Sequence, residues 1–428
     1  MSDHRIFNQV RIGIWIYFYL LIFEGALRKW VLPGLAQPLL IIRDPLGLWI
    51  IFRVIQYNLW KPNKSVVIIW VVSALSFITA LLVGHGSVVV ALYGLRITLI
   101  HFPIMFIVGS IFDKKDVVQM GKAILWINII MTLLVAVQFY SPQSAWVNRG
   151  IGGDEAGSGF GGAAGFLRVP GTFSFTNGLS LFYGFATSYI FYFWLNPREE
   201  VSRTVLIIST LALLAAIPLS ISRSVLFQVI LSVTFMVLIS SKNPKVIKSL
   251  IGGAIGITLM SVILSFFTFF QTSVMVFTTR FDNASKVEGG IEGTIFDRFL
   301  GGSYSALVND DATFFGLGLG MGTNAGSQLL TGGKTFLISE GEWGRLIGEM
   351  GFVLGMIMII IRMNIVATMF IKSWKVINKG NTLPWMLLSF GAITLLQGQW
   401  AQPTALGFST LIGGLIIAAF NNRKEIKM

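Results

Sequence analysis

Long apolar segments alternate with short polar ones along most of the 428-residue chain. A helix of about 20 apolar residues crosses the hydrocarbon core of a bilayer, so each segment of that length predicts one membrane span. Segments of this kind begin near Ile12, Pro38, Val66, Val88, Ala123, Asn177, Thr204, Val225, Leu250, Glu342, Leu383 and Ala405. The pattern predicts an all-α, polytopic membrane protein of about twelve transmembrane helices.

Two connections are much longer than the others. One is rich in glycine and covers residues 141–176, and the other covers residues 271–341. We therefore expect transmembrane helices one to nine in residues 1–270. A large, partly helical extracytoplasmic loop is expected in residues 271–341, and helices ten to twelve in residues 342–428.

Composition supports the membrane prediction and excludes several kinds of chemistry. Hydrophobic residues make up 54% of the chain, charged residues make up 12%, and the mean hydropathy is +0.76, which is too apolar for a soluble domain. The net charge of +13 comes from scattered single basic residues, so no nucleic-acid-binding surface is predicted. Cysteine is absent and the three histidines share no metal-ligand spacing. We therefore expect no disulfide, no metal site and no cofactor.

The distribution of Lys and Arg predicts the orientation in the membrane. One side of the predicted spans carries roughly twice as many of these residues as the other, and basic loops face the cytoplasm. The richer side includes Arg362, and the poorer side includes Arg28 and Lys29. Both termini are therefore expected in the cytoplasm and both long loops outside it.

Arginine is concentrated in the outer half of the predicted spans and loops. Its planar guanidinium binds phosphate oxygens through two parallel hydrogen bonds and stays charged in apolar surroundings, which suits a diphosphate at the membrane surface. The alternative is that each arginine reaches up to lipid phosphates or pairs with a nearby aspartate. The candidate substrate-binding residues are Arg168, Arg223 and Arg298, followed by Arg43, Arg96, Arg280 and Arg345.

Charged residues gather at the start of the tenth span, in the sequence SEGEWGRLIGE. Ser339 and Glu342 fit a capping box, in which each side chain accepts a hydrogen bond from the backbone of the other. Glu342, Arg345 and Glu349 are spaced by three and four residues, so we expect an ion ladder on one helical face. Glu340 has no assigned partner and is the preferred proton acceptor. Glu342 takes that role if the helix begins one residue away.

The sequence GLGLGMG at residues 316–322 is similar to a nucleotide-binding loop. No predicted strand precedes it, and it belongs to an outer loop, away from cytoplasmic nucleotides. We therefore expect a tight extracellular turn close to the substrate.

Taken in order, these features resemble the O-antigen ligase and Wzy-type O-antigen polymerase superfamily. The resemblance covers the chain from about Arg168 onward. It rests on the arginine before GTFSFTN, the short SRS hairpin, the arginine before the GLGLG turn, and a long helix that carries Glu349, Gly351 and Gly355. The overall plan, about twelve spans with a large outer loop before the tenth, is similar too.

The resemblance implies an inverting glycosyltransferase in the bacterial inner (cytoplasmic) membrane, with its active site facing the periplasm. Members of the superfamily transfer a glycan from an undecaprenyl-diphosphate carrier without a metal or a nucleotide. The arginines would hold the diphosphate, and a base would activate the acceptor hydroxyl. Glu340 stands at the position where the ligases carry a histidine.

We therefore expect a polymerase that joins lipid-linked oligosaccharide repeats of an O-antigen or exopolysaccharide. Two alternatives stay open: a ligase that transfers the glycan to lipid A-core, and a non-enzymatic flippase or transporter of lipid-linked oligosaccharides. The expected partners are the undecaprenyl-diphosphate-linked donor, a lipid-linked or lipid A-core acceptor, the lipid bilayer and a chain-length regulator. No nucleic acid is among them.

Overall fold

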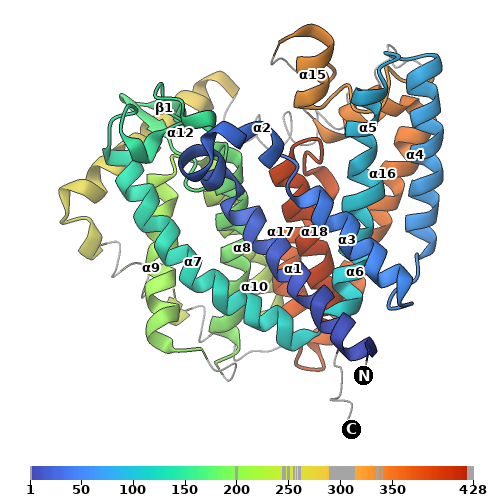
Figure 1. The fold of residues 1–428 in the computed structure, drawn as a ribbon. Coiled ribbons are helices and arrows are strands. Elements are labelled where there is room, and N and C mark those ends of the chain that lie inside the picture. Colours follow the sequence, from blue (N-terminus) through green and yellow to red (C-terminus); the bar gives the residue numbers. More distant parts are fainter. Residues whose placement is uncertain are drawn as a thin grey trace.

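Helices make up most of the chain, and the long ones stand side by side as a bundle (Figure 1). The computed structural model describes residues 2–197, 201–242, 247, 251–253, 256, 258, 262–288, 314–333, 337–339 and 341–421. The first half of the chain forms α1 (Ser2–Ala26), η1 (Leu27–Val31), η2 (Pro33–Leu35), α2 (Ala36–Leu39), α3 (Arg43–Gln56), α4 (Lys64–Leu82), α5 (Val88–Arg96), η3 (Ile97–His101), α6 (Phe102–Ile111), α7 (Lys114–Tyr140), η4 (Trp146–Asn148), η5 (Ile151–Gly153), β1 (Phe160–Ala163) and β2 (Phe166–Arg168). The second half forms α8 (Thr176–Leu195), α9 (Arg203–Leu219), α10 (Arg223–Ser240), α12 (Thr268–Glu288), α15 (Asn324–Thr331), α16 (Glu342–Ile377), α17 (Leu383–Gln397) and α18 (Pro403–Ala418).

Several of these helices have the length and composition of membrane spans. Within the described ranges, six helical segments are long and apolar enough to cross a bilayer. They are Arg5–Val31, Lys64–Leu82, Val88–Ile111, Lys114–Tyr140, Arg223–Ser240 and Glu342–Ile377. The shorter apolar helices are Arg203–Leu219, Leu383–Gln397 and Pro403–Ala418. The chain is therefore a mostly helical membrane protein, whereas the total of twelve spans stays a prediction, since much of the span expected from Leu250 lies outside the described residues.

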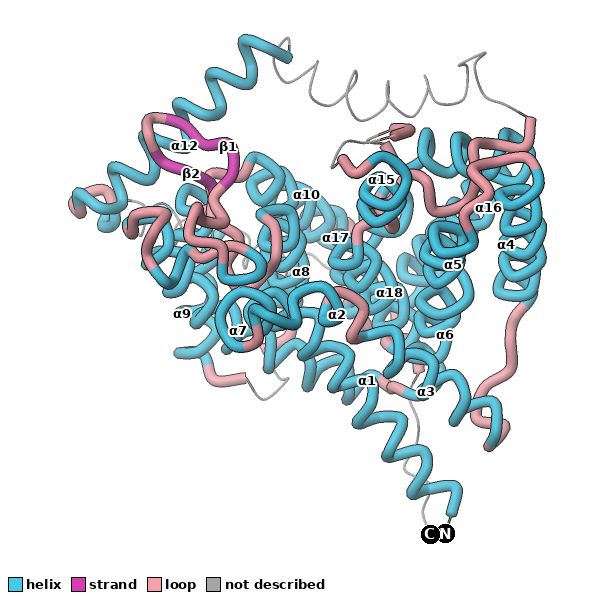
Figure 2. Tube along the Cα trace, turned by 45° about the horizontal axis from the view of Figure 1, so that its top comes forward, coloured by secondary structure: helices cyan, strands magenta, loops and turns pink. Residues whose placement is uncertain are grey.

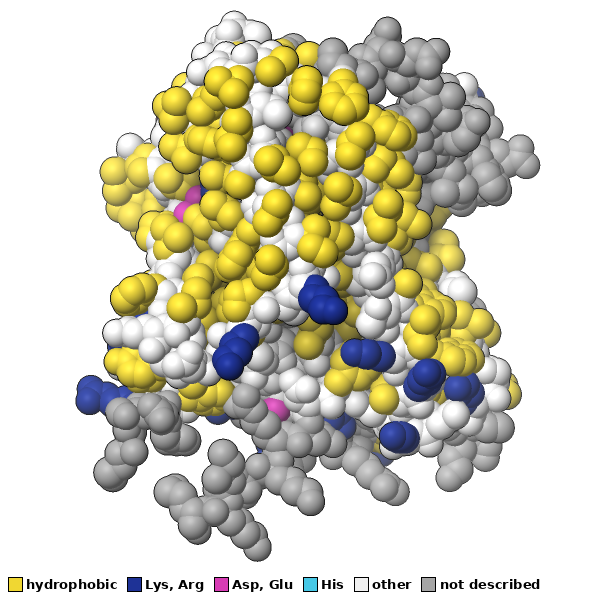
Figure 3. All heavy atoms as spheres, turned by 90° about the vertical axis from the view of Figure 1, so that its right-hand side faces the viewer, with side chains coloured by type: hydrophobic (Ala, Val, Ile, Leu, Met, Phe, Trp, Pro, Cys, Tyr) yellow, Lys and Arg dark blue, Asp and Glu magenta, His cyan; other side chains and the backbone are white. Residues whose placement is uncertain are grey.

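The outside of the bundle is apolar, and polar side chains point inward. On α4, Val67, Val71 and Ile78 are exposed, whereas Ser73 and Ser76 are fully buried. Figure 3 shows the face that lies on the right in Figure 1. A broad band of apolar side chains covers it, and Lys and Arg gather below that band. This inverted pattern is the one that a bilayer favours, because lipid solvates apolar groups and not polar ones.

The start of α1, the start of α7 and the end of α18 meet at one end of the bundle. Arg11 of α1 forms a salt bridge with Asp116 of α7, and the backbone N–H of Lys114 donates to the carbonyl of Asn421 at 3.1 Å. The opposite end, at the top of Figure 1, holds α2, β1, α12 and α15, and we call it the loop end. Figure 2 brings this end forward and shows the hairpin and α12 on one side and α15 on the other.

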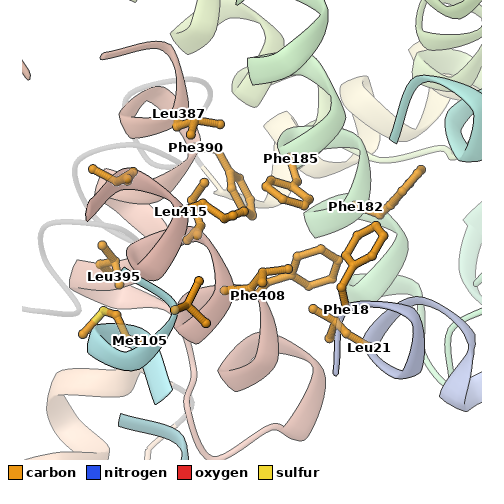
Figure 4. Close-up of a cluster of buried hydrophobic side chains, with 14 of the residues drawn as sticks. Phe18, Leu21, Met105, Phe182, Phe185, Leu387, Phe390, Leu395, Phe408 and Leu415 are labelled. Atoms are coloured by element: carbon orange, nitrogen blue, oxygen red, sulfur yellow. The ribbon is translucent and has the colours of Figure 1, made fainter. Parts of the chain in front are cut away.

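Close packing and aromatic side chains hold α18 among its neighbours. A Cβ at Gly413 would lie 2.2 Å from Sδ of Met105, and a Cβ at Gly414 would lie 2.5 Å from Cβ of Val108, so side chains of α6 pack directly on the glycines of α18. Small residues at such contacts are the usual basis of helix association in membranes. A buried aromatic cluster packs against α18 (Figure 4): Phe18, Phe182, Phe185, Phe390 and Phe408.

The all-α prediction needs one correction. Residues 160–168, within the glycine-rich connection, form a two-stranded antiparallel hairpin in which Phe160 pairs with Arg168 and Ala163 with Phe166. The turn uses Ala164 and Gly165, both at positive φ (49° and 81°), as a tight hairpin turn requires. The correction matters because β2 carries Arg168.

Candidate functional site

A buried ion network lies at the start of α16. Arg345 donates to both carboxylate oxygens of Glu342, from Nε to Oε2 at 3.0 Å and from Nη2 to Oε1 at 2.8 Å. Its third nitrogen, Nη1, donates to Oε2 of Glu349 at 2.6 Å. Glu342 is 3% exposed, Arg345 is 4% exposed and Glu349 is 0% exposed. The predicted ion ladder is therefore confirmed, and it is buried.

A second arginine completes this network. Arg362 donates from Nη1 to Oε1 of Glu342 at 2.6 Å, and its remaining nitrogens bind two backbone carbonyls, Leu395 O at 2.7 Å and Gly398 O at 3.1 Å. The ring of Trp400 covers the guanidinium, with 3.9 Å from its centroid to Cζ. The backbone N–H of Trp400 donates to Oε2 of Glu342 at 3.1 Å. We call Glu342, Arg345, Glu349 and Arg362 the α16 network.

The predicted capping box is wrong. The N-cap of α16 is Gly341, without a side-chain hydrogen bond, and the hydroxyl of Ser339 accepts from the N–H of Gly341 at 3.1 Å. Glu342 turns inward instead because two buried guanidinium groups bind a carboxylate more strongly than one exposed N–H does.

The sequence predicts Arg362 and Glu342 on opposite sides of the spans, and the structure corrects this by bringing them into contact. Arg362 contacts Glu342, which precedes it by 20 residues, although a straight helix of that length spans about 30 Å. The helix reverses at Gly351, whose φ and ψ are 79° and 168°. A Cβ at Gly355 would lie 2.9 Å from Cα of Ile347, so the two arms of α16 pack side by side.

The GLGLG segment fills this reversal. The N–H groups of Leu317 and Gly318 donate to the carbonyls of Gly348 and Glu349 at 2.7 and 3.1 Å, which the reversal has freed from helical bonds. Glycine is required because φ is +73° at Gly316 and a Cβ there would lie 2.4 Å from the backbone N of Gly351. The prediction of a tight turn is confirmed.

Two of the candidate arginines belong to another buried network, which joins α1, α3, α5 and η3. Arg43 pairs with Glu24 at 3.4 Å and donates to the carbonyl of Pro403 at 2.6 Å. Arg96 binds both oxygens of Asp44 at 2.9 Å. His101 bridges Asp44 and the hydroxyl of Tyr17, at 2.8 Å to each. We call this set of six the α1–α3 network: Arg43, Glu24, Arg96, Asp44, His101 and Tyr17.

The cations of η1 hold the segment that follows Arg168. Lys29 donates to the carbonyl of Gly171 at 2.6 Å, and Arg28 donates to the hydroxyl of Ser174 at 2.9 Å. The hydroxyl of Thr172 in turn donates to the carbonyl of Ile22 at 2.7 Å. Sequence reasoning counted Arg28 and Lys29 only as outer-side charges. In the structure they are buried and tie β2 and the start of α8 to α1.

Three candidate arginines come together at the loop end, and we call them the arginine cluster: Arg168 of β2, Arg223 at the start of α10 and Arg280 of α12. Burial, followed by the positive charges of Arg280 and Arg223, lowers the pKa of Arg168 to about 10. Arg280 donates to the carbonyl of Gly162 at 3.4 Å. Within the described part of the chain, Nε of Arg168 is buried and has no hydrogen-bond partner.

The structure thus sorts the residues predicted from the sequence. Arg43 and Arg96 are in the α1–α3 network, Arg345 and Glu342 are in the α16 network, and the arginine cluster gathers the remaining described candidates. Arg298 and Glu340 lie outside the described residues. Sequence reasoning missed the role of Arg362, and no local pattern identifies it, because its partner is reached only through the reversal at Gly351.

The described residues contain no group of three or more His, Asp or Glu side chains that could hold a metal ion. Comparison of the chain with known protein families, with characterised proteins and with solved structures finds no match. The arrangement of the site itself is therefore the basis for the function proposed below.

Removing Arg362 tests the α16 network. Arg362→Met is expected to lower the free energy of unfolding by about 3 kcal/mol, because it leaves the buried Glu342 with one guanidinium in place of two. Thermal unfolding of the purified protein in detergent measures the change. Lys375→Met is the control, since Lys375 is an exposed cation on the same helix. If both variants unfold at the same temperature, the network does not stabilise the fold.

Proposed function

We propose that this chain is a metal-independent, inverting glycosyltransferase that polymerises undecaprenyl-diphosphate-linked oligosaccharide repeats at the outer face of the bacterial inner membrane. The observation that carries the proposal is the arginine cluster at the loop end of an apolar helical bundle. Its three cations lie close enough that two of them lower the pKa of the third. A multivalent anion would relieve that repulsion, as the diphosphate of a lipid carrier does.

The surroundings of the cluster support a lipid-linked ligand. Phe160, which pairs with Arg168 in the hairpin, packs against Phe175 with 5.1 Å between the ring centroids. Both rings are about half exposed, at 55% and 49%. Exposed aromatic groups beside the cations offer an apolar surface to a polyprenyl chain, and the cations face the phosphates.

Among the glutamates, Glu340 is the better candidate for the base. Glu342 accepts hydrogen bonds from Arg345, Arg362 and the N–H of Trp400, so both of its carboxylate oxygens already have donors. The two neighbours of Glu340 in sequence, Ser339 and Gly341, line a small cleft together with Glu342 and residues of the α17–α18 connection. We assign the base to Glu340 and a structural role to Glu342.

The reaction then follows a single displacement. Glu340 takes the proton of the acceptor hydroxyl as its oxygen bonds to the anomeric carbon of the donor sugar. The bond from that carbon to the diphosphate oxygen breaks on the opposite face, and its electron pair leaves with the diphosphate. Arg168, Arg223 and Arg280, with Arg298, stabilise the negative charge that develops on this leaving group.

We extend the proposal to topology: about twelve spans, both termini in the cytoplasm and the loop end in the periplasm. The acceptor would be another lipid-linked repeat, and a chain-length regulator would be a partner. A ligase acting on lipid A-core would differ only in its acceptor. A flippase is less favoured because the arginine cluster lies at one end of the bundle, whereas a transport path needs cations along the bundle.

Reporter fusions test the topology. A fusion at Asn283 of α12 is expected to report the periplasm, and one at Asn381 the cytoplasm, because the side chain of Asn381 donates to the carbonyl of Ala419 at the far end of the bundle. Alkaline phosphatase activity and green fluorescence measure the two compartments. The proposed topology is wrong if both fusions report the same one.

Arg223→Lys tests the diphosphate site. The variant keeps the charge but loses the planar fork, so elongation of lipid-linked repeats should fall roughly tenfold to a hundredfold, as expected for one charge-assisted hydrogen bond. The assay uses purified protein with EDTA and without nucleotide. Arg149→Lys is the matched control, because Arg149 pairs with Glu155 in an exposed loop. Full activity of the Arg223→Lys protein would contradict diphosphate binding.

Glutamine variants distinguish the roles of Glu340 and Glu342. Glu340→Gln should fold normally and lose about 100-fold or more in turnover, the usual effect of removing a general base. Glu342→Gln should mainly lower the unfolding temperature, because it removes a charge from the α16 network. Turnover and thermal unfolding are measured on both. A stable, inactive Glu342→Gln protein beside an active Glu340→Gln protein would reverse the assignment.

A further inference from the structure

A series of neutral polar side chains leads from the arginine cluster toward the start of α16. Ser222, the neighbour of Arg223, hydrogen-bonds to Ser180 of α8 at 2.8 Å. One turn earlier on α8, the amide of Asn177 donates to Oε1 of Gln402 at 3.3 Å. Gln402 in turn donates to Oε1 of Gln399 at 2.5 Å. We call these five residues the amide track.

The track ends in a small cleft at the start of α16. It is lined by Gln399 and Gln402, by Asn324 and Ser339, and by Glu342 and Arg345 of the α16 network. The space measures about 10 Å³, which is the size of one water molecule or one hydroxyl group. Neutral amide and hydroxyl side chains thus share this space, which accepts a single hydroxyl, with the charged Glu342 and Arg345.

The chemistry of the track differs from that of the arginine cluster. An amide offers both a donor and an acceptor, as a sugar hydroxyl does, and it carries no charge that would hold a phosphate. A lipid-linked saccharide has the same division, with a charged diphosphate at one end and neutral hydroxyl groups beyond it. The spatial order of the two groups, cations first and amides beyond them, matches that ligand.

The α16 network holds the amide track in position. Arg362 donates to the carbonyls on both sides of the end of α17, Leu395 and Gly398. Glu342 accepts from the N–H of Trp400, and the indole of Trp343 donates to the carbonyl of Leu396 at 3.0 Å. The backbone of the α17–α18 connection is thus fixed by buried hydrogen bonds, as a preorganised binding site requires.

We propose that the amide track is a saccharide subsite, in which Gln402, Gln399 and Asn177 recognise hydroxyl groups of the sugar attached to the diphosphate. Gln402 is the central residue because it bonds to both of the others. The inference rests on the proposed lipid-linked substrate. It adds the residues that make binding of the glycan-linked carrier tighter than binding of the carrier without sugar.

Two ligands test the proposal: undecaprenyl diphosphate without sugar, and undecaprenyl-diphosphate-linked oligosaccharides extracted from the cells in which the chain is native. Binding is measured by microscale thermophoresis in detergent. The wild-type protein is expected to bind the glycan-linked carrier about tenfold more tightly, as two neutral hydrogen bonds would give. Gln402→Ala should remove that difference and leave the affinity for the bare carrier unchanged.

Three further variants make the result specific. Gln402→Met keeps the side-chain length and removes both hydrogen-bonding groups, so it should behave as Gln402→Ala does and serves if the alanine variant unfolds. Gln37→Ala, an exposed glutamine of α2 at the same end, should behave as the wild type. Arg223→Lys should weaken the binding of both carriers alike and preserve the difference between them.

The proposal is overturned if the wild type binds both carriers equally, or if the Gln402 variants weaken both to the same extent, as a purely structural role predicts. Its failure is distinct from failure of the enzymatic proposal. A protein that prefers the glycan-linked carrier but does not lengthen it has the subsite without the transferase activity. A protein that lengthens glycans while the Gln402 variants match the wild type has the activity without the subsite.

Discussion

The bidentate pair between Glu342 and Arg345, deep in the bundle, is the interaction on which the loop end depends. Two carboxylates and two guanidinium groups balance one another there, and Arg362 and Trp400 share the same carboxylate. Buried charges are costly unless every partner is present, so the network admits one arrangement of the segments that supply it. It joins both arms of α16, the glycine-rich turn at residues 316–322 and the α17–α18 connection, although these parts are far apart in the sequence.

Buried carboxylates pair with three of the candidate arginines. Arg43 and Arg96 have Glu24 and Asp44 as partners, and Arg345 has two glutamates. In the arginine cluster, burial and then the positive charges of Arg280 and Arg223 lower the pKa of Arg168 to about 10. Because this pKa is lowered in the folded protein, protonated Arg168 reduces the free energy of unfolding at pH values below about 10. A bound anion would offset that reduction.

The η1 cations and the α16 network position different segments of the loop end. Cations of η1 hold residues 171–174, which connect Arg168 to α8, and the α16 network holds the connection that carries Gln399 and Gln402. The proposed diphosphate and saccharide sites therefore rest on separate supports that meet where Asn177 contacts Gln402. The proposed substrate, with a charged end and a neutral end, would need both supports, and buried polar groups are costly in an apolar bundle.

The sequence by itself was enough for features that depend on neighbouring residues. Apolar runs predicted most of the described helices, because a bilayer requires a stretch of fixed length, and the spacing of Glu342, Arg345 and Glu349 predicted their ladder, because three and four residues make one helical turn. Tertiary structure alone decided the rest. The single positive φ of Gly351 turned α16 back so that Arg362 reached Glu342, and the packing of β2, α10 and α12 brought Arg168, Arg223 and Arg280 together. Contacts between distant segments depend on how the chain reverses and packs, and no local pattern of residues carries that information.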